Sequence, residues 1–509
     1  MQLHHGLPTY ASSSFARRSA WLLAPTIASL IAIAPLAVRA AGAARRNAVA
    51  QLAVVAVLLV VSGIALRALR LSRPMVLAAL AAIAVRFAYL YVTPYSERTH
   101  DAGQHVDYID YILSRHAIPP PSAGWAFYHP PLYYLLSAAL WRVMALGAAP
   151  RPSQFVALQI ESIVFQLGFL AFALLAAQRW LDRLPNARLG ARPAVRTRLG
   201  PLFAALICLW PSGIIHAVRV GNDDLFYLFF GAALYFVTRW WQDDRARDFH
   251  LAAASAALAM LAKSNGAIVF AVLGCLFVAR ILLDDKRSLR VYLRLAWPGL
   301  LMLCVSAGST LLRAVLDAKT RQGNLLVGNA GSLPHNLDVG NGAANYLWFD
   351  VKMFVTQPYT NSFTDDAGRQ YFWNFALKTG LFGDFQFNDP WPSNLAVVMS
   401  VSFLAVLACT VLGVLRQSRA DWMAELPLTL TIGIAMPALA ALRMSIPMAC
   451  SNDFRYVWPI LMPSIYLYVR GVARLREAGR LGLAWSAEAA GWSLAGMSLV
   501  FISLVAAHG

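Results

Sequence analysis

The first residues that could do chemistry lie in the polar stretch 94–130, which holds Asp101, His105 and His129. Within it, residues 101–115 have helical spacing, and side chains three and four apart meet on one face of a helix. Asp101 and His105 are therefore expected side by side, where a carboxylate could act as a general base and the histidines could bind substrate. The alternative for Asp101 is an N-terminal helix cap.

A second cluster, residues 216–224, stands where an apolar run reaches a membrane surface. Its polar residues Arg219, Asn222, Asp223 and Asp224 are costly there unless they meet partners or water. As a functional site, the turn would place Asp223 across a cleft from the first stretch, with Asn222 and Asp224 as substrate ligands. The alternative is a plain turn whose Asn and Asp residues cap the next helix.

A third cluster, Lys263-Ser264-Asn265-Gly266, interrupts the apolar run 251–283. That run is too long for one membrane span, since a span needs about 20 residues. We therefore predict two helices that meet at Lys263. A lysine just beneath a membrane surface needs an anion, and phosphate is a natural one; the alternative is that the side chain snorkels to the interface.

The fourth cluster is Asn452-Asp453-Phe454-Arg455-Tyr456, at the predicted start of another span. Arg455 is either a second phosphate-binding donor or the partner of Asp453 in a structural ion pair. Lys378, within the long polar segment 317–393, is a weaker candidate for substrate binding.

Carboxylates and cations at one membrane face suit the transfer of a group from a lipid-linked phosphate donor. An Asp would accept the proton of an acceptor hydroxyl. Lys263, with Arg455 or Arg219, would stabilise the charge that develops on the leaving phosphate. The spacing of these residues does not by itself choose a sugar as the transferred group.

The composition indicates a polytopic, all-α membrane protein. Of 509 residues, 59% are hydrophobic and 13% are charged, against roughly 45–50% and about 25% in an average globular protein. The net charge of +18 would suggest a nucleic-acid partner in a soluble protein. Here most of the excess falls on loops expected in the cytoplasm, so it is an orientation signal and predicts no nucleic-acid binding.

The apolar runs predict the membrane spans. The candidates lie near 20–38, 48–66, 74–93, 131–148, 154–178, 200–220, 224–241, 251–283 (two helices), 295–316, 394–415, 424–443, 455–470 and 481–507.

Basic loops fix the predicted orientation, because Arg and Lys in short loops face the cytoplasm. The loops 179–198, 280–294 and 470–480 are strongly basic. If 131–148 crossed the membrane, loop 179–198 would lie outside. The conflict disappears if 131–148 is an interfacial helix on the outer face. Thirteen spans follow, with the N-terminus inside and the C-terminus outside.

Four parts are expected along the chain. They are extra transmembrane helices in 1–73, a catalytic transmembrane module in 74–316 with outer loops 94–130 and 220–224, an outer loop region in 317–393, and C-terminal transmembrane helices in 394–509. Residues 20–40 are interpreted as a retained anchor, with a cleaved signal peptide as the alternative.

At these clusters the chain resembles the GT-C superfamily of integral-membrane glycosyltransferases. The likeness is to the bacterial branch related to protein O-mannosyltransferases and to the aminoarabinose transferase acting on lipid A. It runs over residues 74–283 and more loosely to 470. Its elements, in order, are His100-Asp101, Tyr128-His129-Pro130-Pro131-Leu132-Tyr133, Asn222-Asp223 and Lys263-Ser264-Asn265-Gly266. The family usually has Asp-Glu in the first loop, whereas Asp101 is followed by Ala102.

The resemblance implies a GT-C fold of about 13 transmembrane helices with periplasmic juxtamembrane helices, in a bacterial inner membrane. It implies a periplasmic active site, a polyprenyl-phosphate-linked sugar donor and an inverting single displacement. It makes Asp101 the catalytic base, Asp223 a second active-site carboxylate and Lys263 a ligand of the donor phosphate. A glycan, a lipid or a protein would be the acceptor. Some relatives use a divalent cation and others do not, so a metal requirement stays open.

Two other functions fit less well. A polysaccharide polymerase or ligase would also work at the outer face, with a diphosphate-linked glycan as its donor. A transporter of lipid-linked sugars needs a polar path through the middle of the bilayer, whereas the polar clusters here lie near one face.

Overall fold

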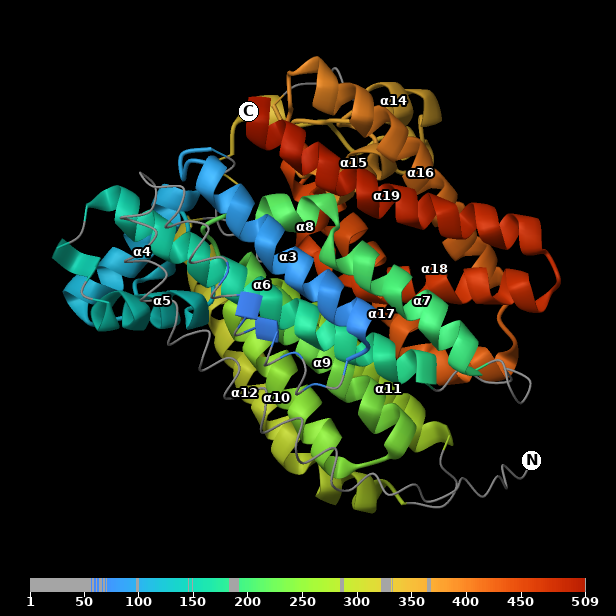
Figure 1. Ribbon diagram of the computed structural model, residues 1–509. Helices are drawn as coiled ribbons and strands as arrows, with labels where there is room; N and C mark the ends of the chain where they lie inside the picture. The colour runs from blue at the N-terminus through green and yellow to red at the C-terminus, as the bar shows by residue number, and fades with distance from the viewer. Residues whose placement is uncertain are drawn as a thin grey trace.

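The computed structural model describes residues 71–508 except 98–99, 145, 149, 183–191, 284–287, 322–330, 332 and 364–367, together with single positions between 56 and 69. The regular elements of this part are all helices (Figure 1), and the backbone pairs as β-structure only in an isolated bridge between Asp338 and Met448. The all-helical class is therefore confirmed. The expected span 20–38 and most of 48–66 lie outside the described residues.

Several helices are long and apolar enough to cross a membrane. In the described part of the chain there are seven: α3 (Arg73–Val92), α6 (Arg151–Asp182), α11 (Ala267–Leu283) with the turn before it, most of α12 (Leu289–Arg321), α16 (Pro390–Leu415), α17 (Arg419–Ser445) and α19 (Leu481–His508). The chain is thus a multi-pass membrane protein, while the total of thirteen spans stays a prediction.

Further helices fill the middle of the bundle. They are α7 (Arg192–Cys208), α8 (Pro211–His216), α9 (Asp223–Asp243), α10 (Ala246–Ala262) and α18 (Leu461–Glu477). α9 packs against both α6 and α10, and α16 packs against α18 and α19. These contacts bring the start of α9, the end of α10 and the start of α18 to one end of the molecule.

Three predictions about spans were wrong in detail. The run 200–220 is two helices, because Pro211 disfavours helical backbone at Trp210, which is extended (φ −62°, ψ 126°). The span predicted over 455–470 begins at Leu461, after short 3-10 turns around Pro459. Part of the predicted basic loop 470–480 is helical, since α18 continues to Glu477 and buries Arg470 and Arg474.

The segment 131–148 forms no helix long enough to cross a membrane, and its predicted place on the outer face stays a prediction. Its helix, α5 (Leu132–Val143), has 12 residues, about 18 Å at 1.5 Å a residue, against a hydrocarbon core of about 30 Å. α4 (Ala102–Arg115) packs against α5 at one edge of the bundle (Figure 1). The helix predicted for 101–115 is therefore confirmed as well.

The predicted break at Lys263 is also confirmed. α10 ends at Ala262, Lys263 is extended, and the 3-10 turn η3 (Ser264–Gly266) leads into α11. A Cβ on Gly266 would collide with backbone atoms of Ala259 and Met260. Glycine is therefore required here, and the close turn that it permits holds Lys263 at the end of α10.

The polar segment 317–393 has short helices of its own. They are α13 (Ala343–Leu347), α14 (Val351–Thr356) and α15 (Phe372–Phe382), and α14 and α15 lie near the C-terminus in Figure 1. α15 packs against α8. This contact carries the following residues, up to Phe385, to the end of the bundle where α9 begins.

Candidate functional site

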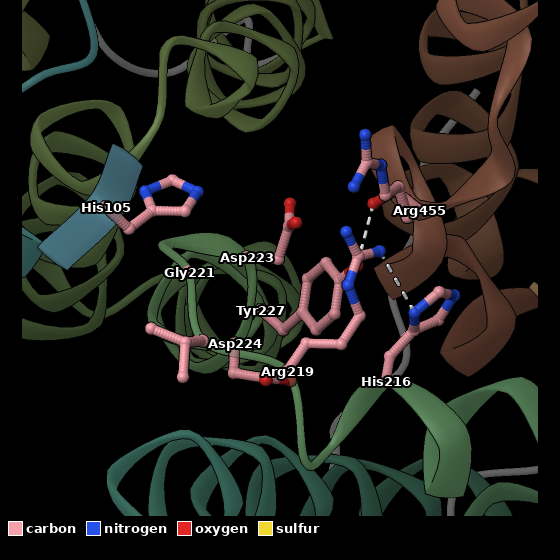
Figure 2. Close-up of a pocket in the computed structure, with 9 residues that line it drawn as sticks. His105, His216, Arg219, Gly221, Asp223, Asp224, Tyr227 and Arg455 are labelled. Carbon is pink, nitrogen blue, oxygen red and sulfur yellow. Dashed lines mark hydrogen bonds between the residues drawn. The ribbon is translucent and has the colours of Figure 1, made fainter. Parts of the chain in front are cut away.

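A small polar cavity lies at the N-terminal end of α9 (Figure 2). It is lined by residues from α4, from the turn before α9, from α9 itself and from the 3-10 turn before α18: His105, His216, Arg219, Val220, Gly221, Asp223, Asp224, Tyr227 and Arg455. Three of the four predicted clusters therefore contribute residues to the cavity wall. The fourth cluster lies next to the cavity, because Lys263 forms an ion pair with Asp223.

Asp223 and Lys263 form an ion pair at the edge of this cavity. Asp223 is in the first turn of α9, where the helix dipole favours a carboxylate. The Lys263 side chain is buried, and its Nζ also lies 4.9 Å from the centre of the Tyr456 ring. Lys263 therefore does not snorkel to an interface but points into the site.

Arg455 and Arg219 add two guanidinium groups to the cavity wall. Arg455 Nε lies 2.9 Å from a carboxylate oxygen of Asp453, so the structural ion pair exists even though Arg455 also faces the cavity. Arg219 stacks over Phe385 at 5.8 Å and contacts His216. Within the described residues, Arg219 forms no ion pair with a carboxylate. The carboxylates of Asp223, Asp453 and Asp101 stabilise its charge without a direct contact.

Asp101 is not a helix cap. Its backbone is left-handed (φ 64°), and its side chain accepts no hydrogen bond from the first turn of α4. The carboxylate is exposed, yet it lies close enough to Arg219 and Arg455 to stabilise their charge. Asp101 therefore stands beside the cavity with its oxygens available.

His105 reaches the cavity from α4, and His129 stands behind it. The two rings stack with their centres 5.8 Å apart, and His105 Nδ1 lies 2.8 Å from the hydroxyl of Tyr134. Burial lowers the pKa of His105 to about 4 and that of His129 well below its usual value. Both imidazoles are therefore neutral near pH 7, and only His105 lines the cavity.

The two neighbours of Asp223 have different surroundings. Asp224 is buried, lines the cavity and accepts a hydrogen bond of 3.2 Å from Gln166. The amide of Asn222 donates to the carbonyl of Ala262 at 3.1 Å. Asn222 thus ties the start of α9 to the end of α10, next to Lys263, and does not line the cavity.

Lys378 is not in this cavity. It lies in α15, where its Nζ is 3.5 Å from the carbonyl oxygen of Tyr359. Burial lowers the pKa of Lys378 to about 7, and Asp350 partly opposes that effect. A role for Lys378 in substrate binding stays a prediction that this geometry does not join to the other residues.

Sequence reasoning missed two residues that build the site. Phe385, from the segment 317–393, stacks on His100 at 5.1 Å and under Arg219. Arg313 of α12 donates to the hydroxyl of Tyr108 and to backbone carbonyls at Pro119, Phe127 and His129. A lone Arg near the end of an apolar run was the only signal for Arg313, and Phe385 had none.

No group of three or more His, Cys, Asp or Glu residues in the described ranges is placed to hold a metal ion. In the cavity, Asp223 lies between His105 and the guanidinium groups of Arg219 and Arg455 (Figure 2).

An all-helical multi-pass fold with this cavity at one end defines the class as a multi-pass membrane protein with a buried cluster of cations and carboxylates. Residues 189–310 match the model of a family described as dolichyl-phosphate-mannose-protein mannosyltransferase. The match supports the predicted resemblance to the GT-C membrane glycosyltransferases. The matched stretch contains Arg219, Asp223 and Lys263, while Asp101 and Arg455 lie outside it.

Among solved structures, the chain is similar to ArnT from Cupriavidus metallidurans. The structure bound to undecaprenyl phosphate is 16% identical, with 80% of this chain and 79% of that chain covered and a TM-score of 0.35. The apo structure is 15% identical, with 78% and 76% covered and the same TM-score. No curated protein matches the chain.

Proposed function

We propose that the protein is a glycosyltransferase that moves a sugar from a polyprenyl-phosphate-linked donor to an acceptor hydroxyl. The reaction takes place at the periplasmic face of a bacterial inner membrane and inverts the configuration of the sugar. The observation that carries this proposal is the cavity in which Arg219, Arg455 and the Asp223–Lys263 pair meet beside Asp101. The family match over 189–310 supports sugar transfer as the class of reaction.

Asp101 is better suited than Asp223 to act as the general base. Oδ1 of Asp223 accepts a hydrogen bond from Lys263 Nζ, and protonation of this carboxylate would weaken that ion pair. Asp101 is exposed and has no ion pair within the described residues. It can therefore accept the proton from an acceptor hydroxyl that arrives from outside the membrane.

The cations would stabilise the leaving group. As the acceptor oxygen bonds to the anomeric carbon, the bond from that carbon to the phosphate oxygen breaks, and polyprenyl phosphate leaves with an added negative charge. Arg219 makes no direct ion pair with a carboxylate of the described residues, and Lys263 and Arg455 lie nearby. Positive groups held in place where charge develops lower the barrier most effectively.

Asp101→Asn tests the assignment of the base. We expect it to reduce sugar transfer by roughly 10²–10⁴-fold in purified protein supplied with a polyprenyl-phosphate sugar. Folding should be unchanged, because the Asp101 side chain makes no hydrogen bond or ion pair in the described residues. Asp107→Asn, an exposed carboxylate of the same helix, is the matched control. Full activity of the Asp101→Asn protein would show that Asp101 is not the general base.

The donor class is tested in the same assay. Wild-type protein is given either a polyprenyl-phosphate sugar or a polyprenyl-diphosphate glycan, and a third sample in vesicles is followed for transport without product. We expect product from the monophosphate donor. Product only from the diphosphate donor would indicate a polymerase or ligase, and transport alone would indicate a transporter.

A further inference from the structure

The imidazole of His105 is one of the neutral polar groups that line the cavity, and one edge of its ring faces open space. Its Nδ1 is held by Tyr134, and within the described part of the chain its Nε2 has no hydrogen-bond partner. Nε2 lies 3.2 Å from the place that a Cβ on residue 221 would occupy. Because residue 221 is glycine, the space in front of Nε2 stays open to the cavity.

The hydrogen bond with Tyr134 fixes the position of the imidazole proton. Tyr134 is fully buried, and His105 is its only hydrogen-bond partner within the described residues. A buried hydroxyl that leaves its proton unbonded costs roughly 1–3 kcal/mol. Tyr134 therefore donates to Nδ1, and the single proton of the neutral imidazole stands on Nε2, which faces the cavity.

The elements around His105 keep this geometry in place. The ring of Tyr134 stacks on Tyr108 with centres 3.7 Å apart, and Arg313 donates to the hydroxyl of Tyr108 at 3.0 Å. Arg313 also binds backbone carbonyls in the connection between α4 and α5. The C-terminal part of α12 therefore stabilises α4 and α5, the two helices that position His105 and Tyr134.

The N–H group of His105 carries no charge, and Asp223 lies between it and the guanidinium groups of Arg219 and Arg455 (Figure 2). Arg219, Lys263 and Arg455 attract the charged phosphate, whereas an uncharged donor gains little from an anion that already has cationic partners. An uncharged donor is suited to an oxygen that is also uncharged. We infer that His105 Nε2, in the space left by Gly221, donates a hydrogen bond to a hydroxyl of the transferred sugar and selects sugars that carry it.

This inference rests on the proposed function and specifies which kind of group on the sugar the site recognises, namely a hydroxyl. The test uses purified full-length protein, a polyprenyl-phosphate hexose and a series of donors that each lack one hydroxyl. His105→Gln keeps an N–H near the position of Nε2, and His105→Asn does not. His335→Asn, an exposed residue of the segment 317–393, is the control.

We expect His105→Asn to lower kcat/KM by about tenfold with the intact donor, the value of one well-placed hydrogen bond. With the single deoxy donor that lacks the recognised hydroxyl, wild type and His105→Asn should be equal. His105→Gln should retain most of the activity. Tyr134→Phe should lower kcat/KM by a few-fold, because the imidazole proton is then shared between its two nitrogens.

Equal activity of wild type and His105→Asn on every donor would overturn the inference. A loss of the same size on every donor, the deoxy series included, would also overturn it, because His105 would then have a structural role. If wild-type protein transfers no sugar from the intact donor, the proposed function fails instead, so the two failures are distinguishable.

The pH dependence of protein stability gives an independent test of whether His105 is buried as a neutral group. Burial lowers the pKa of His105 to about 4; Lys263 and Arg219 add to this effect, and Asp101 and Asp223 oppose it. An unfolded chain has a histidine pKa of about 6.5, so the unfolded state binds the proton first as the pH falls.

The stability that neutral His105 contributes is therefore present above pH 6.5 and is lost as the pH falls towards 4. The thermal midpoint of His105→Asn should fall less over this range than that of wild type. An identical fall in both proteins would show that His105 is not buried as a neutral group.

Discussion

The two ends of α18 each carry a cluster of charged residues, and the clusters are built differently. Before the helix, Arg455 and Arg219 face the cavity, and Arg219 has no carboxylate partner in the described residues. In its C-terminal half, Arg470 contacts Asp421, Glu425 and Glu477 at 3.2–3.5 Å. We call this second group, with Arg474, the distal cluster.

In the distal cluster, charge is balanced within the protein. Arg474 also contacts Asp421 and Glu425, at 3.5 and 3.4 Å, and Tyr466 donates to Glu425 at 3.0 Å. Every cation there has carboxylate partners, so nothing is left for a ligand. From this comparison we expect Arg219, which has no direct ion pair, to act in ligand binding, and the fully paired arginines of the distal cluster to hold helices together.

The largest effect should follow from breaking the distal cluster. Glu425→Gln leaves two buried guanidinium groups with fewer counter-charges, and removing one partner of a buried pair costs about 3–5 kcal/mol. We expect a strongly lowered thermal midpoint in detergent, with sugar transfer per folded molecule unchanged. A variant as stable as wild type would show that the distal cluster does not hold the helices together.

At the cavity, the same kind of change should act on activity instead. Arg219→Gln removes a cation that makes no direct ion pair in the described residues, so folding should change little. Loss of one preorganised group at the developing charge typically lowers the rate by about 10²–10³-fold. Transfer assays and thermal midpoints measured together check this, and a large loss of stability with normal transfer would place Arg219 with the structural arginines.

The smallest effect is expected at an exposed ion pair that belongs to neither cluster. Arg151 and Asp110 lie 3.0 Å apart with both side chains exposed. Such pairs contribute about 0.2–1 kcal/mol, and Asp110 does not line the cavity. Asp110→Asn should therefore change neither the thermal midpoint nor sugar transfer measurably, which sets the baseline for the two preceding variants.

The sequence predicted those features that depend on local pattern. A lysine inside an apolar run that was too long predicted the break at Lys263, and the conflict between basic loops predicted that 131–148 does not cross. The helix over 101–115 followed from its spacing. The break and the helix over 101–115 are confirmed, and the helix in 131–148 is too short to span a membrane by itself. These features follow from the length of each apolar run and from the cost of burying a charge.

Ion pairs and hydrogen bonds between distant segments could not be predicted from the sequence. Arg470 and Arg474 were interpreted as loop cations, but they meet Asp421 and Glu425 from another helix. Arg313 likewise finds its acceptors about 190 residues earlier in the chain. Which cation keeps a partner and which stays open depends on how helices pack, and that is decided by contacts that one sequence does not reveal.

The central claim is that Arg219 is left open for a lipid-linked phosphate. The most direct measurement is the binding of polyprenyl phosphate to purified wild type, Arg219→Gln and Asp110→Asn, by native mass spectrometry or calorimetry. We predict that wild type and Asp110→Asn bind equally and that Arg219→Gln binds at least about tenfold more weakly, as expected for a lost charged hydrogen bond. Equal binding by all three proteins would contradict the account.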